Sequence, residues 1–206
     1  MEKCKYLMRH FYQNIQGWSH YLIPAYRNYL TRLKEYNIQV VEVGCWAGKS
    51  TAFLATELFN NNKNFKLHCV DHWQGCDEEY YTRDDVKNRN VAEEFVKNME
   101  PVKDYIRIYQ MSSVEAANQF AERSLDMICV DDGHDYESVC ASIDAWWPKL
   151  KHSGWMIGDD HDEHYPDVVK AVQERFVGHY YLITEDGFTE TENLTEKNGA
   201  WIVQKI

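Results

Sequence analysis

The chain has 206 residues, 44% of them hydrophobic, which is ordinary for one globular domain with a sizeable core. Its 33 acidic and 22 basic residues give a formal charge of −11, and this balance repels a phosphate backbone and disfavours a nucleic-acid partner. The apolar runs are much shorter than the roughly 20 residues of a membrane span, and the first residues lack the apolar core of a signal peptide. We therefore expect a cytoplasmic protein that binds neither membranes nor nucleic acids.

Short apolar runs alternate with segments of helical periodicity along the chain. The runs, several of them rich in Val and Ile, predict strands at residues 38–43, 65–70, 105–109, 125–130, 155–157, 180–183 and 200–203. Apolar residues that recur every three or four positions predict helices within 53–59, 91–99, 136–150 and 168–176. This order indicates one α/β domain over residues 1–206, with a doubly wound, seven-stranded, mostly parallel sheet.

Three segments depart from simple alternation. Residues 1–36 precede the first strand and are expected to add N-terminal helices, which would form either a dimer surface or a cap over the sheet. Residues 72–104 form a polar insertion, which is expected to act as a lid over a bound ligand and to shape an acceptor pocket. The last two strands have no helix between them, so we expect a terminal hairpin that places an antiparallel strand at the sheet edge.

The first predicted strand ends in a turn that begins with Glu42 and contains Gly44 and Gly48. Glycine lets the backbone turn sharply and approach a ligand closely, and the helix that follows favours an anionic group at its N-terminus. The sequence from Gly48 to Ser50 fits the end of a phosphate-binding P-loop, but the loop is one residue short. A dinucleotide fingerprint fails because Trp46 stands where a second glycine is needed. A glycine turn without any ligand is a further alternative.

The second predicted strand ends in Asp71. A carboxylate at this place can accept two hydrogen bonds from a ribose diol, as an acidic residue does in dinucleotide sites. Taken alone, Asp71 would be a solvated strand end. Together with the turn at Gly44, it favours ribose binding.

Acidic residues also follow the predicted fourth and fifth strands, Asp131 after one and Asp159 with Asp160 after the other. In a parallel sheet both strands end at the edge where ligands bind, so the three carboxylates are expected to converge. Unpaired carboxylates in one cleft repel each other, and a hard cation such as Mg²⁺ would relieve that repulsion. The alternative is that these aspartates cap helices.

His134 lies three residues after Asp131, at the mouth of the same expected cleft. A neutral imidazole there could take a proton from a substrate hydroxyl that a bound metal has made more acidic. A second candidate metal site, His161 with His164, lacks the rest of a zinc motif and is interpreted as a solvated loop.

Two of these patterns resemble known families. The turn from Glu42 to Gly48 closely resembles the first motif of the S-adenosylmethionine-dependent methyltransferases, whose fold also has seven strands ending in this way. Asp131-x-x-His134 followed by Asp159-Asp160 resembles the metal-dependent O-methyltransferases of antibiotic sugars, the macrocin type. The resemblance covers about residues 38–175, and it leaves out the N-terminal helices and the insertion.

The resemblance implies an enzyme that methylates a hydroxyl of a small molecule or sugar. It implies Mg²⁺ on Asp131, Asp159 and Asp160, with His134 as the base. The positions that it assigns to S-adenosylmethionine are Glu42, Gly44, Gly48, Asp71, Ser112 and Asp131. Ser112 follows the third strand, where this family often contacts adenine, but it equally suits a helix N-cap.

Three other functions remain open on the sequence. The first is a metal-independent methyltransferase in which His134 is the only base. The second is a nucleotide-binding or P-loop-like module built on Gly48-Lys49-Ser50. The third is a catalytically silent member of the fold that binds cofactor and serves as an interaction subunit. A homo-oligomer is a further expectation for the assembly of the chain.

Overall fold

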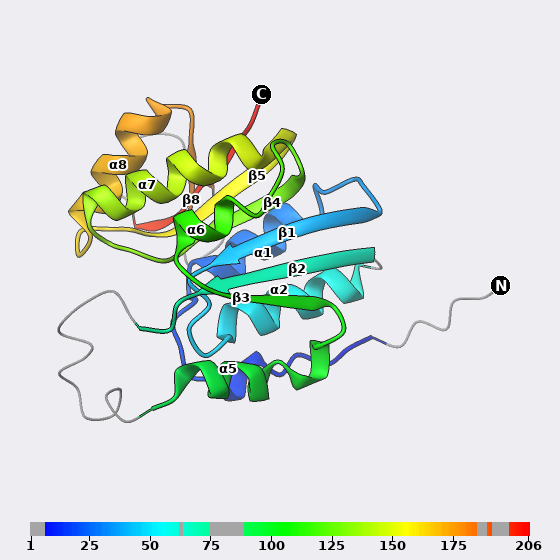
Figure 1. Cartoon of the computed structure of the whole chain (residues 1–206). Coiled ribbons are helices and arrows are strands. Elements are labelled where there is room, and N and C mark those ends of the chain that lie inside the picture. The colour runs from blue at the N-terminus through cyan, green and yellow to red at the C-terminus, as the bar shows by residue number, and fades with distance from the viewer. Residues whose placement is uncertain (1–6, 62–63, 75–88, 185–188, 191–197) are drawn as a thin grey trace.

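The strands form a single mixed sheet in the computed structural model, which describes residues 7–61, 64–74, 89–184, 189–190 and 198–206 (Figure 1). The strand order is β3-β2-β1-β4-β5-β8-β6-β7. The strands are β1 Asn37–Val43, β2 Asn64–Asp71, β3 Ile106–Gln110, β4 Leu125–Val130, β5 Leu150–His161, β6 Tyr181–Ile183, β7 Thr189–Glu190 and β8 Gly199–Gln204. Strands β1 to β5 are parallel, which confirms the doubly wound α/β sheet.

The far end of the sheet is antiparallel, as expected, with one difference in arrangement. The last strand, β8, lies between β5 and β6 and is antiparallel to both. The two-residue strand β7 pairs with β6 and adds an eighth strand to the seven that the sequence predicts. A two-residue strand is too short to leave a periodic signal in the sequence.

Helices cover both faces of the sheet (Figure 1). On one face lie α1 Leu22–Leu30, α2 Lys49–Asn60 and α5 Val91–Asn98, and on the other lie α6 Ser113–Ala117, α7 Tyr136–Trp146 and α8 Pro166–Phe176. Three 3-10 turns complete the described elements: η1 Tyr12–Asn14, η2 Glu100–Val102 and η3 Trp147–Lys149. Within the expected N-terminal helices, the described residues form only η1 and α1.

The central strands place alternate side chains in two separate cores. Val40 of β1 and Met127 of β4 lie in the core beneath α1 and α2, whereas Val41 and Ile128 lie in the core beneath α7 and α8. Successive side chains of a strand point to opposite faces, so a strand covered on both faces reads as a continuous apolar run. This is why these strands could be located from the sequence.

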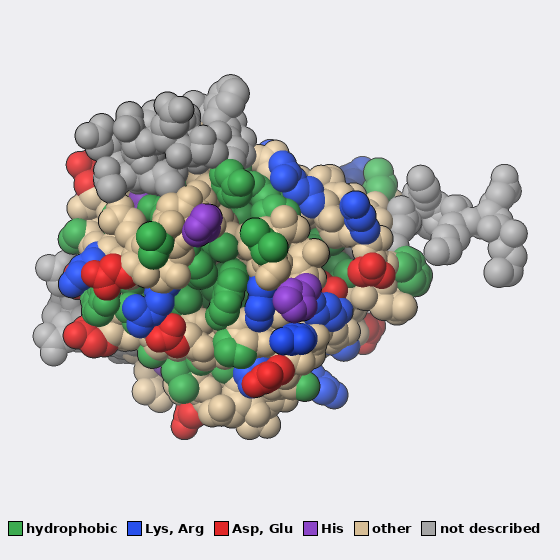
Figure 2. Space-filling view, turned by 90° about the horizontal axis from the view of Figure 1, so that it is seen from above, with side chains coloured by type: hydrophobic (Ala, Val, Ile, Leu, Met, Phe, Trp, Pro, Cys, Tyr) green, Lys and Arg blue, Asp and Glu red, His purple; other side chains and the backbone are tan. Residues whose placement is uncertain are grey.

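On the face seen in Figure 2, Lys and Arg side chains lie among Asp and Glu side chains, with apolar side chains between them. Among the described helices, none has both the length and the apolar character that a membrane crossing requires.

Candidate active site

A cavity of about 730 Å³ opens at the carboxyl ends of the parallel strands. Its described walls come from the ends of β1 to β5 and the segments that follow them, from one side of α7, from residues 16–18 and 20–21 of the N-terminal segment, and from Asn198 before β8. Ligands of open α/β sheets bind at this edge. The N-terminal contribution was missed in the sequence because no motif marks it.

The glycine turn after β1 brings two strand ends together. Gly44 has a φ of 84°, and a Cβ there would lie 1.6 Å from the carbonyl oxygen of Asp131, so only glycine fits. Gly48 has a φ of 93°, and a Cβ there would lie 2.6 Å from Cε of Met99. Gly44 lines the cavity, whereas the space beside Gly48 is filled by α5 and the turn that follows it.

Glu42 lies beneath this turn and is completely buried. Its carboxylate accepts hydrogen bonds from the Tyr26 hydroxyl, at 3.1 Å, and from the Thr51 hydroxyl. Burial raises the pKa of Glu42, and the hydroxyl donors oppose that rise. The structure therefore places the Glu42 side chain as a support for the turn, outside the cavity wall that a cofactor would touch.

Asp71 lines the cavity and holds two tryptophans in place. Its Oδ2 accepts a hydrogen bond from the backbone N–H of Trp46 at 2.8 Å, and its Oδ1 accepts one from Trp73 at 2.6 Å. Both tryptophans have positive φ, 48° and 53°, a conformation that bulky residues rarely adopt. Each carboxylate oxygen retains a further lone-pair site, so these bonds leave Asp71 able to accept from a ribose.

Ser112 also lines the cavity, but its hydroxyl forms a helix cap. It accepts from the backbone N–H of Glu115 and donates to the Glu115 carboxylate at 2.7 Å, while that carboxylate accepts from the Ser112 N–H. This is the capping box of α6. The N-cap alternative for Ser112 is thus present in the structure, and a direct cofactor contact by its hydroxyl stays a prediction.

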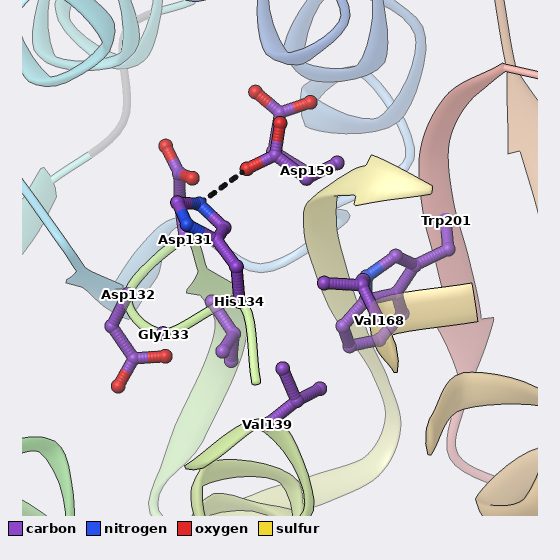
Figure 3. Close-up of a pocket in the computed structure, with 10 residues that line it drawn as sticks. Asp131, Asp132, Gly133, His134, Val139, Asp159, Val168 and Trp201 are labelled. Carbon is purple, nitrogen blue, oxygen red and sulfur yellow. Dashed lines mark ion pairs between the residues drawn. The ribbon is translucent and has the colours of Figure 1, made fainter. Parts of the chain in front are cut away.

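The predicted acidic cluster forms at the tips of β4 and β5. Asp131, His134 and Asp160 each offer a ligand atom, and these atoms lie within 4.8 Å of one another. Nε2 of His134 is 2.9 Å from Oδ2 of Asp160 (Figure 3). Asp160 itself has a φ of 60°, a strained conformation that aims its side chain at the cluster.

Asp159 lies beside this cluster without belonging to the group of three. It is buried, and its Oδ1 has no hydrogen-bond partner. Burial, followed by the neighbouring carboxylates, raises the pKa of both Asp131 and Asp159 well above the usual range. The structure thus gathers two of the three predicted metal ligands with the predicted base, and leaves Asp159 as a buried carboxylate next to them.

The second candidate metal site does not assemble. His161 is buried, and its Nε2 lies 3.2 Å from the Tyr180 hydroxyl. The backbone N–H of His164 instead donates a hydrogen bond to Oδ1 of Asp162 at 2.8 Å. Among the described residues, Asp131, His134 and Asp160 form the single cluster that could hold a metal.

The expected lid is only partly within the described chain. Residues 75–88 lie outside it, so the lid there stays a prediction. Helix α5, which was also expected to cover the ligand, instead buries Phe95 in the core beneath the glycine turn and contributes no described residue to the cavity wall.

A Rossmann-like sheet with a glycine turn and an acidic second strand end at its ligand-binding edge is typical of domains that bind a nucleotide cofactor. Residues 41–161, more than half of the chain, match a family model described as a methyltransferase domain. The chain therefore belongs to this methyltransferase family, as the resemblance in its motifs predicts.

One curated relative and several solved structures are similar to the chain. An uncharacterized protein, y4gI, of Sinorhizobium fredii is 26% identical over 112 residues, which are 54% of this chain and only 12% of that protein. Cofactor-bound Rv0187 from MTB has a TM-score of 0.61 at 12% identity, over 93% of this chain and 82% of its own.

Two further solved structures are O-methyltransferases. NovP has a TM-score of 0.58 at 17% identity, over 89% of this chain and 78% of its own. CalS11, a TDP-rhamnose 3'-O-methyltransferase of calicheamicin biosynthesis, has a TM-score of 0.57 at 14% identity, over 88% of this chain and 78% of its own. Identities this low show a shared fold, which is the class I methyltransferase fold.

Proposed function

We propose that the chain is an S-adenosylmethionine-dependent O-methyltransferase that acts on a hydroxyl of a small molecule or sugar. One observation carries the proposal: the Gly44 turn, Asp71 and the cluster of Asp131, His134 and Asp160 all line a single cavity. A cofactor site and a proton-accepting site within one cavity are what methyl transfer to a hydroxyl requires. The O-methyltransferases among the similar structures agree with this choice.

The cofactor would lie in the part of the cavity that is formed by the ends of β1, β2 and β3. Gly44 permits close approach of the backbone, Asp71 accepts from the ribose, and the segment from Met111 to Val114 borders the adenine. S-adenosylmethionine, when bound, supplies an electrophilic methyl group. Because both sites lie in one cavity, the two reactants would be held close together.

The acidic cluster fits a hard divalent cation. Asp131 and Asp160 offer carboxylate oxygens to one point, and the unpartnered Oδ1 of Asp159 is a further candidate ligand beside them. A bound cation would offset the repulsion that raises the pKa of Asp131 and Asp159. Mg²⁺, when bound, supplies Lewis acidity that makes a nearby hydroxyl easier to deprotonate.

His134 is the proposed base for the acceptor hydroxyl. Its ring stacks on Tyr165, at a centroid distance of 4.3 Å, and its Nε2 faces the Asp160 carboxylate. The stacking fixes the ring plane, and the carboxylate stabilises the imidazolium that forms after proton uptake. The acceptor oxygen would then carry the methyl group in place of its proton, the proton would stay on His134, and S-adenosylhomocysteine, left by breakage of the sulfur–methyl bond, would be the other product.

Calorimetry with the purified chain tests the cofactor. We expect saturable binding of S-adenosylhomocysteine and no comparable binding of ATP. Tight ATP binding without S-adenosylhomocysteine binding would favour the P-loop-like module instead, although Ser50 of that motif is buried. Absence of S-adenosylhomocysteine binding would contradict the proposal.

Once an acceptor is found, methyl transfer in excess EDTA tests the metal. We expect activity to be lost and to return when Mg²⁺ is restored. Full activity in EDTA would show a metal-independent enzyme with His134 as its only base. An Asp160→Asn variant should lose activity while it still binds S-adenosylhomocysteine.

A further inference from the structure

The N-terminal segment before α1 forms a wall of the cavity that lies outside the methyltransferase domain. Residues 16–18 and 20–21 line the cavity, whereas the family match begins at residue 41. The segment is anchored at both ends, because Ile15 and Leu22 are buried in the core beneath α1 and α2. Proteins that share a fold differ in function through the sites that are added to it, so recognition of the acceptor is expected at this wall.

Trp18 of this segment faces the cavity and is not part of the core. The residue is 49% exposed and lines the cavity, although the neighbouring Ser19 is buried. The ring centroids of Trp18 and Trp46 lie 6.4 Å apart, with an angle of 47° between the ring planes. A large aromatic surface that stays open inside a cavity is typical of a wall that binds a ligand.

Trp46 is held in place beside Trp18 by hydrogen bonds at each of its polar groups. Its indole N–H donates to Oε1 of Gln16 at 2.8 Å, and its carbonyl oxygen accepts from the indole N–H of Trp73 at 2.8 Å. Its backbone N–H donates to Asp71. The positive φ of Trp46 is a strained conformation of the kind that gathers at functional sites. The ring face is therefore what Trp46 offers to a ligand.

Two polar side chains next to this pair of tryptophans are occupied as well. Oε1 of Gln16 accepts from Trp46 and, at 3.2 Å, from Arg89. Both carboxylate oxygens of Asp71 accept from backbone N–H groups, and the proposed function assigns their remaining lone pairs to the ribose. A sugar ring carries several hydroxyl groups that need hydrogen-bond partners once they leave water. The pair of Trp18 and Trp46 therefore suits a flat aromatic ring better than a sugar ring.

We propose that the acceptor is a phenol, and that Trp18 and Trp46 bind the face of its aromatic ring while its hydroxyl reaches His134. This inference rests on the proposed function, which it narrows from any small-molecule hydroxyl to a phenolic one. Offset or tilted pairs of aromatic rings are favourable beyond the area that they bury. In the transfer, the phenol oxygen forms a bond to the methyl carbon as the sulfur–methyl bond breaks, and the phenol proton passes to His134.

Calorimetry on the full chain saturated with S-adenosylhomocysteine tests the inference with two probes, 7-hydroxycoumarin and methyl β-D-glucopyranoside. We expect the wild type to bind the coumarin at least about tenfold more tightly than the glucoside, because two ring contacts favour the aromatic probe. Trp18→Leu should weaken coumarin binding at least about fivefold, whereas Trp18→Phe keeps an aromatic face and should stay within about twofold of the wild type.

Two further measurements show whether the effect of Trp18 is specific to the acceptor. The affinity of Trp18→Leu for S-adenosylhomocysteine alone should equal that of the wild type. The control Tyr181→Leu removes an aromatic ring that is 41% exposed on β6, outside the described cavity wall, and should leave coumarin binding unchanged.

The outcomes separate this inference from the proposed function. Tighter binding of the glucoside than of the coumarin overturns the inference, as does binding of neither probe or an unchanged coumarin affinity in a folded Trp18→Leu protein. A parallel loss of S-adenosylhomocysteine affinity in Trp18→Leu would place the ring against the cofactor and also overturn it. Each of these results leaves the proposed function standing, because the wild type still binds S-adenosylhomocysteine. If the wild type does not bind S-adenosylhomocysteine, the proposed function and the inference both fail.

Discussion

Gly44 sets the distance between the ends of β1 and β4, and thereby the shape of the cavity floor. A Cβ at this position would overlap the backbone of Asp131, and the residue also has a positive φ. We expect Gly44→Ala to lower the free energy of unfolding by about 3 kcal/mol or more, measured by urea denaturation. Gly178 has a φ of 74° with open space around it, so Gly178→Ala should lose only about 1 kcal/mol. Equal losses would show that conformation alone, without the close approach, explains Gly44.

His68 should make the protein sensitive to acid. Burial is the main cause that lowers the pKa of His68 to about 4. Its ring is bonded to Gln39 and Tyr109. Because the folded pKa lies below the unfolded value, the neutral ring contributes stability above about pH 6.5, and this contribution is lost as the pH falls towards 4.

A substitution at His68 should therefore flatten the pH dependence of stability. We expect His68→Gln to be less stable than the wild type near pH 7, but to lose roughly 2 kcal/mol less on going to about pH 4.5. Urea denaturation at the two pH values measures this difference. The exposed His179 offers a control, since His179→Gln should keep the wild-type slope. A wild-type slope in His68→Gln would refute the assignment.

The positions of individual site residues could be predicted from the sequence where these residues lie at or just after the end of a strand. Asp71, Asp131, His134 and Asp160 were expected at one sheet edge, and the structure places them around one cavity. The environment of Glu42 could not be read from the sequence, because its partner Tyr26 comes from a helix that no motif links to the turn.

At the scale of elements, the cap of α6 is the clearest local determinant. The helix has only five residues, and its capping box satisfies backbone groups that such a short helix cannot satisfy itself. We expect Ser112→Ala to lower the free energy of unfolding by about 1 kcal/mol. Thr31→Ala, at an exposed hydroxyl after α1, should change it by less than about 0.5 kcal/mol. Urea denaturation of both variants makes the comparison, and equal effects would contradict the capping role.

Elements that are buried on both faces were the easiest to predict from the sequence. Strands β1, β2 and β4 are buried on both faces, so their apolar runs could be recognised. Helix α5 was expected from its periodicity, but its position was not, because a repeat of apolar residues does not say which surface it packs on. The strand β7 has too few residues to leave any pattern.

At the scale of the whole molecule, the cavity joins segments from the N-terminal part to the end of β5. A ligand that bridges them should stabilise the entire fold, because it binds the folded state only. We expect S-adenosylhomocysteine at about 100 times its Kd to add roughly 2.7 kcal/mol of stability, seen as a higher Tm. Mg²⁺ should raise the Tm further in the wild type but not in Asp160→Asn. An equal Mg²⁺ effect in both proteins would place the cation elsewhere.

The arrangement of cofactor and cation in one cavity is tested most directly by a crystal structure of the chain with S-adenosylhomocysteine and Mn²⁺, in which anomalous scattering locates the metal. We expect the ribose at Asp71, the adenine beside Met111, and the metal peak at the carboxylates of Asp131 and Asp160. A nucleoside bound outside this cavity, or a metal peak away from Asp131 and Asp160, would contradict the account.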